Sequence, residues 1–78
     1  MHYCFVSPGS LVPIIEHGTP PSAPLPVAIS NLGKTLLHVI VDGHSFDLQP
    51  TESRIYIGHD RIEVHDDSSK GGMFTFSL

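Results

Sequence analysis

From Leu25 to Leu78 the chain alternates apolar and polar residues in short runs that are separated by turn residues. The runs are LPVAIS, TLLHVIV, HSFDL, RIYI, RIEVH and MFTFSL, and none shows a sustained helical period. A period of two is typical of strands that bury one face, and turn signals about every 8–12 residues are typical of sandwiches and barrels. We therefore predict an all-β domain, a small antiparallel β-sandwich or open barrel of about six to eight short strands.

Asp42-Gly43 is the strongest turn signal in the chain, because an Asp-Gly loop favours the tight turn of a β-hairpin. Counting outward from this turn places His38 opposite Asp47 on one face of the sheet. We expect further hairpins at GHDR and DDSSKGG. Extending the alternation predicts this core: Leu37, Val39, Val41, Phe46, Leu48, Ile55, Ile57, Ile62, Val64, Phe74, Phe76 and Leu78. The opposite face is expected to carry His38, Ile40, Ser45, Asp47, Arg54, Tyr56, Arg61, Glu63 and His65.

The first third of the chain is rich in proline, with six of the seven prolines between positions 8 and 26. HYCFV and LVPIIE are predicted to be extended, and Pro13 restricts the second segment to an edge strand or an irregular arm. The closely spaced prolines that follow favour polyproline-type extension. We divide the chain into residues 1–24, an extended arm or edge strands, and residues 25–78, the β-sandwich domain.

Charge and cysteine content narrow the classes of function. The net charge is −4 and the four basic residues are scattered, so nucleic-acid binding is not expected. No run is long enough for a membrane span, and the first residues do not resemble a signal peptide. Cys4 is the only cysteine and lies in an apolar run, which indicates a small core residue. Charged residues make up only 15% of the chain, which suggests that part of the surface is covered by a partner.

Six histidines raise the question of a metal or catalytic site. Zinc needs three or four converging ligands, but the chain has no HxH, HExxH or CxxC spacing. A polar cross-strand pair is the simpler interpretation of His38 and Asp47. No serine lies in a nucleophile elbow, and SSKGG lies between predicted strands and not before a helix. We therefore predict no catalytic residue, no cofactor and no metal site.

The order of pieces in VAISNLGKTLLHVIVDGHSFDLQPTESRIYI resembles small immunoglobulin-like β-sandwich modules, although a core cysteine pair and a tryptophan are missing. Such modules occur in bacteriophage virions as decoration, cement or tail accessory proteins. The resemblance implies a non-enzymatic accessory subunit that docks on a larger assembly of capsid or tail proteins. It also implies a location in the virion, or in the host cytoplasm before assembly.

The predicted docking mechanism is burial of apolar side chains together with strand addition at a sheet edge. The expected partner-binding residues are Tyr3, Phe5, Leu11, Ile14, Ile15, Ile40 and Tyr56. Self-association into a homo-oligomer would compensate for the small core. Two alternatives stay open. One is a module that binds metal or carbohydrate through the His-rich face. The other is an inhibitor of a host protein with an acidic surface, made of Glu16, Asp60, Glu63, Asp66 and Asp67.

Overall fold

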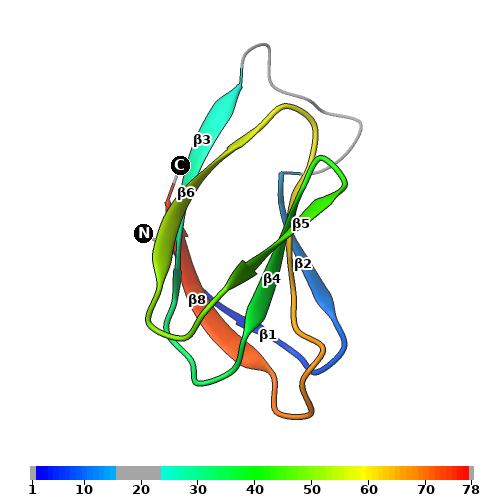
Figure 1. Cartoon of the computed structure of the whole chain (residues 1–78), viewed down its shortest axis with the longest axis vertical. Helices are drawn as coiled ribbons and strands as arrows, with labels where there is room; N and C mark the ends of the chain where they lie inside the picture. The colour runs from blue at the N-terminus through cyan, green and yellow to red at the C-terminus, as the bar shows by residue number, and fades with distance from the viewer. Residues whose placement is uncertain (1, 16–23, 78) are drawn as a thin grey trace.

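The computed structural model describes residues 2–15 and 24–77, which form eight β-strands in two layers (Figure 1). The strands are β1 (His2–Val6), β2 (Leu11–Ile15), β3 (Leu25–Asn31), β4 (Leu37–Val41), β5 (His44–Leu48), β6 (Ser53–Gly58), β7 (Ile62–His65) and β8 (Gly72–Ser77). They build two four-stranded antiparallel sheets, in the orders β1-β8-β3-β6 and β2-β7-β4-β5. The prediction of an all-β sandwich is confirmed.

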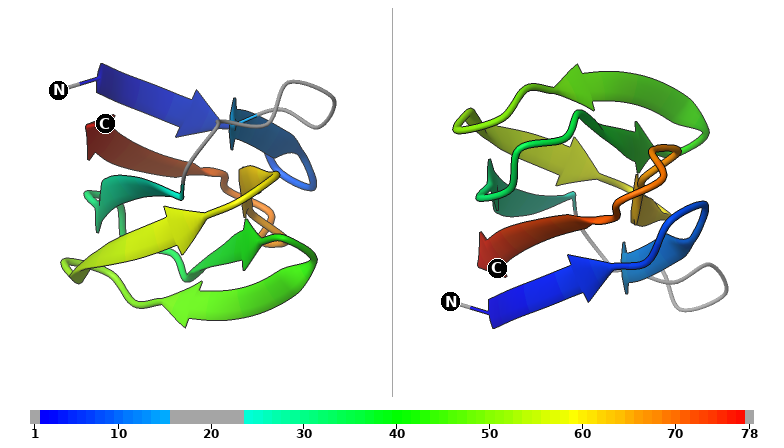
Figure 2. Two further views of the ribbon diagram at one scale, coloured as in Figure 1. Left: turned by 90° about the horizontal axis from the view of Figure 1, so that it is seen from above. Right: turned by 90° about the horizontal axis from the view of Figure 1, so that it is seen from below.

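The chain crosses from one sheet to the other at every connection except the one between β4 and β5. This topology is a jelly roll, in which strands that follow one another face each other across the core (Figure 2). The predicted hairpins at GHDR and DDSSKGG are therefore wrong, because β7 pairs with β4 and not with β6, and β8 pairs with β3 and β1. Turn residues show that the chain reverses, but they do not show whether the next strand pairs or packs opposite.

The β4–β5 hairpin has the predicted register, with His38 opposite Asp47 and Val39 opposite Phe46. Asp42 and Gly43 have φ angles of 48° and 89°. Positive φ at both loop residues is the type I′ turn that Asp-Gly favours. This hairpin is the part of the fold that sequence reasoning describes most completely.

An apolar cluster fills the space between the sheets. Its fully buried members include Val6, Val27, Ile29, Leu37, Val39, Leu48, Ile62, Val64 and Phe74. Cys4 is half-buried against this cluster, as expected of a small core residue. The core prediction is wrong for Ile55 and Ile57, which are 72% and 57% exposed. Phe46 faces the predicted side, but β5 is an edge strand and its ring stays half exposed beside Tyr56.

The pairing of β6 with β3 explains the error at Ile55. Tyr56 pairs with buried Val27, so Tyr56 points into the core and its two isoleucine neighbours point outward. Gly58 lies on the same side as Tyr56, and a Cβ there would lie 2.6 Å from the Ile62 side chain. Glycine therefore fits at position 58, where a side chain would clash with Ile62. Because side chains alternate along a strand, Tyr56 then faces inward, and Ile55 and Ile57 face outward. The prediction that Tyr56 lies on the solvent-facing side is wrong for the same reason.

Residues 2–15 supply one edge strand to each sheet. β1 pairs with β8, and β2 pairs with β7 with a register irregularity between Pro13 and Ile15. Pro13 thus lies on an edge strand, as its missing N–H requires. Glu16, Leu78 and the proline-rich segment up to residue 23 lie outside the described residues, whereas Pro26 lies on β3.

Candidate functional site

Among residues 2–15 and 24–77, no charged side chain lies on the outer face of the β1-β8-β3-β6 sheet. Its exposed apolar residues are Tyr3, Phe5, Ile55, Ile57 and Met73, which lie on the strands at both edges and on β8. Its smaller residues are Pro26, Ala28, Ser30, Ser53, Thr75 and Ser77. Alternation along the strands turns these side chains away from the core. We call this surface the uncharged face.

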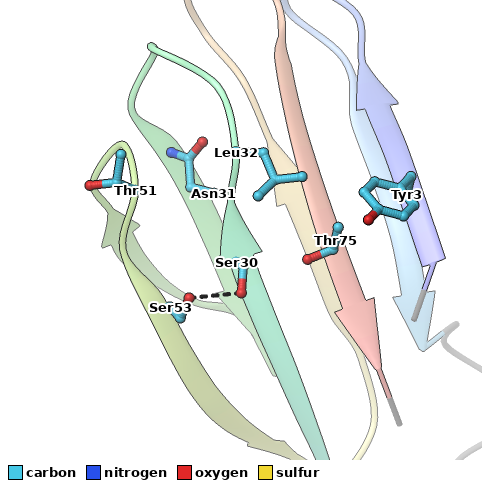
Figure 3. Close-up of a pocket in the computed structure, with 7 residues that line it drawn as sticks. All are labelled: Tyr3, Ser30, Asn31, Leu32, Thr51, Ser53 and Thr75. Atoms are coloured by element: carbon cyan, nitrogen blue, oxygen red, sulfur yellow. Dashed lines mark hydrogen bonds between the residues drawn. The ribbon is translucent and has the colours of Figure 1, made fainter.

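The uncharged face is hollowed near its centre (Figure 3). A groove of about 370 Å³ is lined by Tyr3, Ser30, Asn31, Leu32, Thr51, Ser53 and Thr75, so that all four strands and two flanking segments contribute. The hydroxyls of Ser30 and Ser53 lie 2.7 Å apart and form a hydrogen bond across β3 and β6. The lining can contact apolar groups along its rim and hydrogen-bond to hydroxyls on its floor.

The size of the apolar surface distinguishes it from scattered exposed residues. Tyr3 and Phe5 are 71% and 57% exposed. Since an aromatic side chain offers roughly 150–250 Å², the two rings together expose on the order of 250 Å². The exposed isoleucines Ile55 and Ile57 on β6 form a second apolar area at the opposite edge of the same face, with β8 and β3 between the two areas.

Charges begin at the rim of the uncharged face. The Arg54 guanidinium on β6 donates to the Glu52 carboxylate at 2.8 and 3.0 Å. The backbone N–H of Gln49 donates to the same carboxylate and, together with Arg54, lowers the pKa of Glu52. The pKa of Arg54 is raised by its hydrogen bond to Glu52. Both side chains therefore stay ionised and form a charged border at the β6 edge of the uncharged face.

A second hollow, also of about 370 Å³, lies at the open side of the sandwich between β5 and β6. It is lined by Val41, Phe46, Arg54, Ile55, Tyr56 and Ile57. Both isoleucines also belong to the uncharged face. Burial raises the pKa of the Tyr56 phenol. The Tyr56 hydroxyl is buried and has no hydrogen-bond partner among the described residues.

The predicted partner-binding residues do not gather at one place. Tyr3 and Phe5 lie on the uncharged face, whereas Leu11 is about half exposed on the other sheet. Ile14, which is partly buried, and Ile15, which is buried, pack into the core. The other two are Ile40, which is half-buried on β4, and Tyr56, which is buried.

The sequence predicts that Ile55 and Ile57 face the core, and therefore it does not predict the uncharged face. Arg54 lies on the same side of β6 as Tyr56. Because a charged residue usually faces solvent, Arg54 favours the incorrect prediction that this side points outward. The signal that points the other way is Gly58, which continues the Arg54–Tyr56 alternation at a place where a side chain must be absent.

The His-rich face lies on the other sheet. His38 Nδ1 lies 3.0 Å from Asp47 and its Nε2 lies 3.2 Å from Asp67, and both carboxylates are exposed. The His65 ring stacks on His38 at 6.1 Å, but its Nδ1 lies 3.0 Å from the Ser10 carbonyl oxygen. The predicted rung of His38 and Asp47 is confirmed. Across residues 2–15 and 24–77 no cluster of three His, Cys, Asp or Glu side chains is arranged to hold a metal ion.

The proposed acidic surface is smaller than the sequence suggests. Asp66 is fully buried and accepts hydrogen bonds from the backbone N–H and the hydroxyl of Ser68. Glu63 is nearly buried and pairs with Arg61 at 3.0 Å. These two carboxylates stabilise local structure and are not available to a partner.

Two solved structures have a similar fold. The chain superposes on the crystal structure of the Cupin_2 domain of an XRE family transcriptional regulator from Enterobacter cloacae with a TM-score of 0.73 and 18% identity. The match covers 95% of this chain and 73% of that domain. The fold is cupin-like. The crystal structure of PirA also matches, with a TM-score of 0.71, 20% identity and coverage of 96% of this chain and 89% of PirA.

The cupin-like fold corrects the resemblance stated above. The immunoglobulin-like assignment is wrong, since the chain superposes on a Cupin_2 domain over 95% of its length and its strands have a jelly-roll order. Nothing in these comparisons supports a virion or phage protein. No protein-family model matches the sequence, and neither does any curated protein. The described part of the chain also contains no helix that is long and apolar enough to cross a membrane.

Proposed function

We propose that this cupin-like domain is a non-enzymatic protein-binding module, and that another protein docks on its uncharged face. The observation that carries the proposal is the placement of charge. Eleven of the twelve Asp, Glu, Lys and Arg residues lie in the described part of the chain, and none of these eleven side chains lies on the uncharged face. A sheet face that only met water would gain solubility from charged residues at these positions.

The groove lined by Tyr3, Ser30 and Thr75 gives the proposed interface its centre. A partner that inserts an apolar side chain there would bury the exposed rings and isoleucines around it. The serine and threonine hydroxyls on the floor can satisfy one or two polar groups of the same partner. The border formed by Arg54 and Glu52 adds orientation more than affinity, because exposed ion pairs contribute little.

A pair of matched substitutions tests this function. The full chain is immobilised, proteins are captured from extracts of its source cells, and each captured protein is purified and its Kd measured. Ile55→Glu places a charge on the uncharged face, and Leu11→Glu makes the same kind of change at an exposed position on the other sheet. We expect Ile55→Glu to weaken binding at least about tenfold, a change that 1.4 kcal/mol produces. Leu11→Glu is expected to leave the Kd unchanged.

The reverse pattern would overturn the proposal. Binding that survives Ile55→Glu but is lost in Leu11→Glu would assign docking to the His-rich sheet. An enzymatic turnover that depends on residues of the apolar interior would contradict the non-enzymatic assignment.

A further inference from the structure

The four strands at the sheet edges differ in their protection against pairing with another chain. β2 contains Pro13 and an irregular register. Exposed Asp47 lies on β5, and β6 carries Arg54, which is 59% exposed. Prolines, irregular pairing and charged residues are the features by which native sheets prevent the addition of a further strand.

β1 has none of these features. Its sequence HYCFV contains no proline and no Asp, Glu, Lys or Arg. It pairs with β8 in unbroken register from His2 opposite Phe76 to Val6 opposite Gly72. Figure 2 shows β1 at the border of the molecule, with β8 on its inner side. Among the described residues β1 pairs on one side only, so its other side presents backbone N–H and C=O groups on a regular strand without Asp, Glu, Lys or Arg.

We propose that β1 pairs with β1 of a second copy of this chain, antiparallel and in a register centred on Cys4. In this register Tyr3 of each copy lies opposite Phe5 of the other, so twofold symmetry creates two aromatic cross-strand pairs. Both residues point to the outer side of the sheet. The two sheets then form one continuous sheet, and the uncharged faces of the two copies become a single surface.

Three observations favour a second copy over an unrelated strand. The strand complements itself, because aromatic residues stand at equal distances on both sides of Cys4. The chain has a net charge of −4, so two copies repel each other at acidic surfaces. β1 contains no acidic residue, and contact along it brings no acidic side chains of the two strands together. A chain of 78 residues buries a small core, and pairing adds stability that the core does not supply.

The proposed dimer contact uses the β1 edge of the sheet, whereas the proposed docking of another protein uses the uncharged face. Light scattering on the full chain, with reductant present to exclude a Cys4 disulfide, should give the mass of a dimer. Tyr3→Glu/Phe5→Glu places Glu opposite Glu twice in the proposed register. Tyr3→Glu/Phe5→Lys removes the same two aromatic rings but places Glu opposite Lys twice. We expect the dimer Kd of the first variant to be weaker than that of the second by about tenfold or more.

Equal dimer Kd values for the two variants would overturn the register, and a wild-type monomer at millimolar concentration would overturn the dimer. Hydrogen exchange on the wild-type chain adds a test that needs no substitution. The protection of β1 amides should rise with protein concentration, and protection that is independent of concentration contradicts the pairing. Ile55→Glu is expected to leave the dimer intact while it weakens docking, so the two proposals fail separately.

Discussion

Asp42 and Arg61 exchange two hydrogen bonds at the end of the β4–β7 ladder, next to the pair of Val41 and Ile62. The Asp42 backbone N–H donates to the Arg61 carbonyl at 2.8 Å, and the Arg61 N–H donates to the Asp42 carboxylate at 2.8 Å. The backbone N–H groups of His59 and Asp60 donate to the same carboxylate. One side chain in the β4–β5 turn thus holds the connection between β6 and β7, which belong to different sheets.

Asp42→Asn is expected to lower the free energy of unfolding at pH 7. Asparagine tolerates the left-handed backbone of the turn, but it offers one acceptor oxygen in place of two. The backbone N–H groups of Arg61, His59 and Asp60 hold the pKa of Asp42 below its ordinary value of 3.8. Because the folded-state pKa is lowered, the carboxylate stabilises the fold above about pH 4, and this contribution is lost as the pH falls through the folded-state pKa.

Urea unfolding of both proteins between pH 7 and pH 2 measures the effect. The difference in free energy between wild type and Asp42→Asn should shrink below pH 4. A difference that stays constant over the whole range would show that the ionised carboxylate is not the cause.

Asn31→Ala should cost about 2–4 kcal/mol, because buried polar groups lose their partners. The Asn31 amide donates to the carbonyls of Thr35 and Leu48 at 2.9 and 3.0 Å and accepts from the Gly33 N–H. Its side chain is almost completely buried and joins the end of β3 to the end of β5. Urea unfolding gives the free energy. Ser30→Ala, at the neighbouring half-buried position, removes one hydroxyl hydrogen bond and is the control; it should change stability by less than about 1.5 kcal/mol. Equal losses would argue against the role of Asn31.

Gly71 is expected to tolerate alanine less well than Gly9. Both glycines have positive φ, 78° and 74°, so a side chain costs each about 1–2 kcal/mol. A Cβ at Gly71 would also lie 2.7 Å from the Phe5 ring and 2.8 Å from the Val6 carbonyl oxygen, whereas a Cβ at Gly9 meets nothing within 4 Å. Thermal or urea unfolding should show an additional loss of about 1–3 kcal/mol for Gly71→Ala. Similar losses at both sites would mean that β1 does not pack against residue 71 as described.

Ile62→Ala and Ile55→Ala test the side of each strand that faces the core. Ile62 is fully buried, so its truncation should cost about 2–5 kcal/mol. Ile55 is 72% exposed, and its truncation should cost less than about 1 kcal/mol. Urea unfolding of the two variants gives the comparison. Equal costs would restore the alternation that the sequence alone indicates.

How far the sequence predicts this fold depends on how local each feature is. The Asp42-Gly43 turn determines the register of β4 and β5 from two residues, and that register was predicted correctly. The partner of β6 is β3, which is more than twenty residues away, and no local pattern reveals it. The alternation in RIYI is therefore compatible with either side of the strand facing the core. The uncharged face cannot be predicted without the pairing of β6 with β3.

The candidate site shows the same limit. The sequence predicts Tyr3 and Phe5 as partner-binding residues because they lie in an apolar segment, and exposed apolar surface is usually buried by a partner. Ile15 was selected for the same reason, but it covers the core of its own domain. Apolar character alone does not tell whether a residue meets its own core or a partner.

Tyr56→Phe is expected to leave stability unchanged or to raise it by up to about 1 kcal/mol, because the buried hydroxyl has no partner among the described residues. Burial raises the pKa of Tyr56 above its ordinary value of 10.0. A raised folded-state pKa means that the neutral phenol stabilises the fold at lower pH, and this contribution is lost as the pH rises through the folded-state pKa. Wild type should therefore lose stability above about pH 10 relative to Tyr56→Phe. Urea unfolding at pH 7 and in steps above pH 9 measures both effects, and a large loss at pH 7 would show that the hydroxyl has a partner after all.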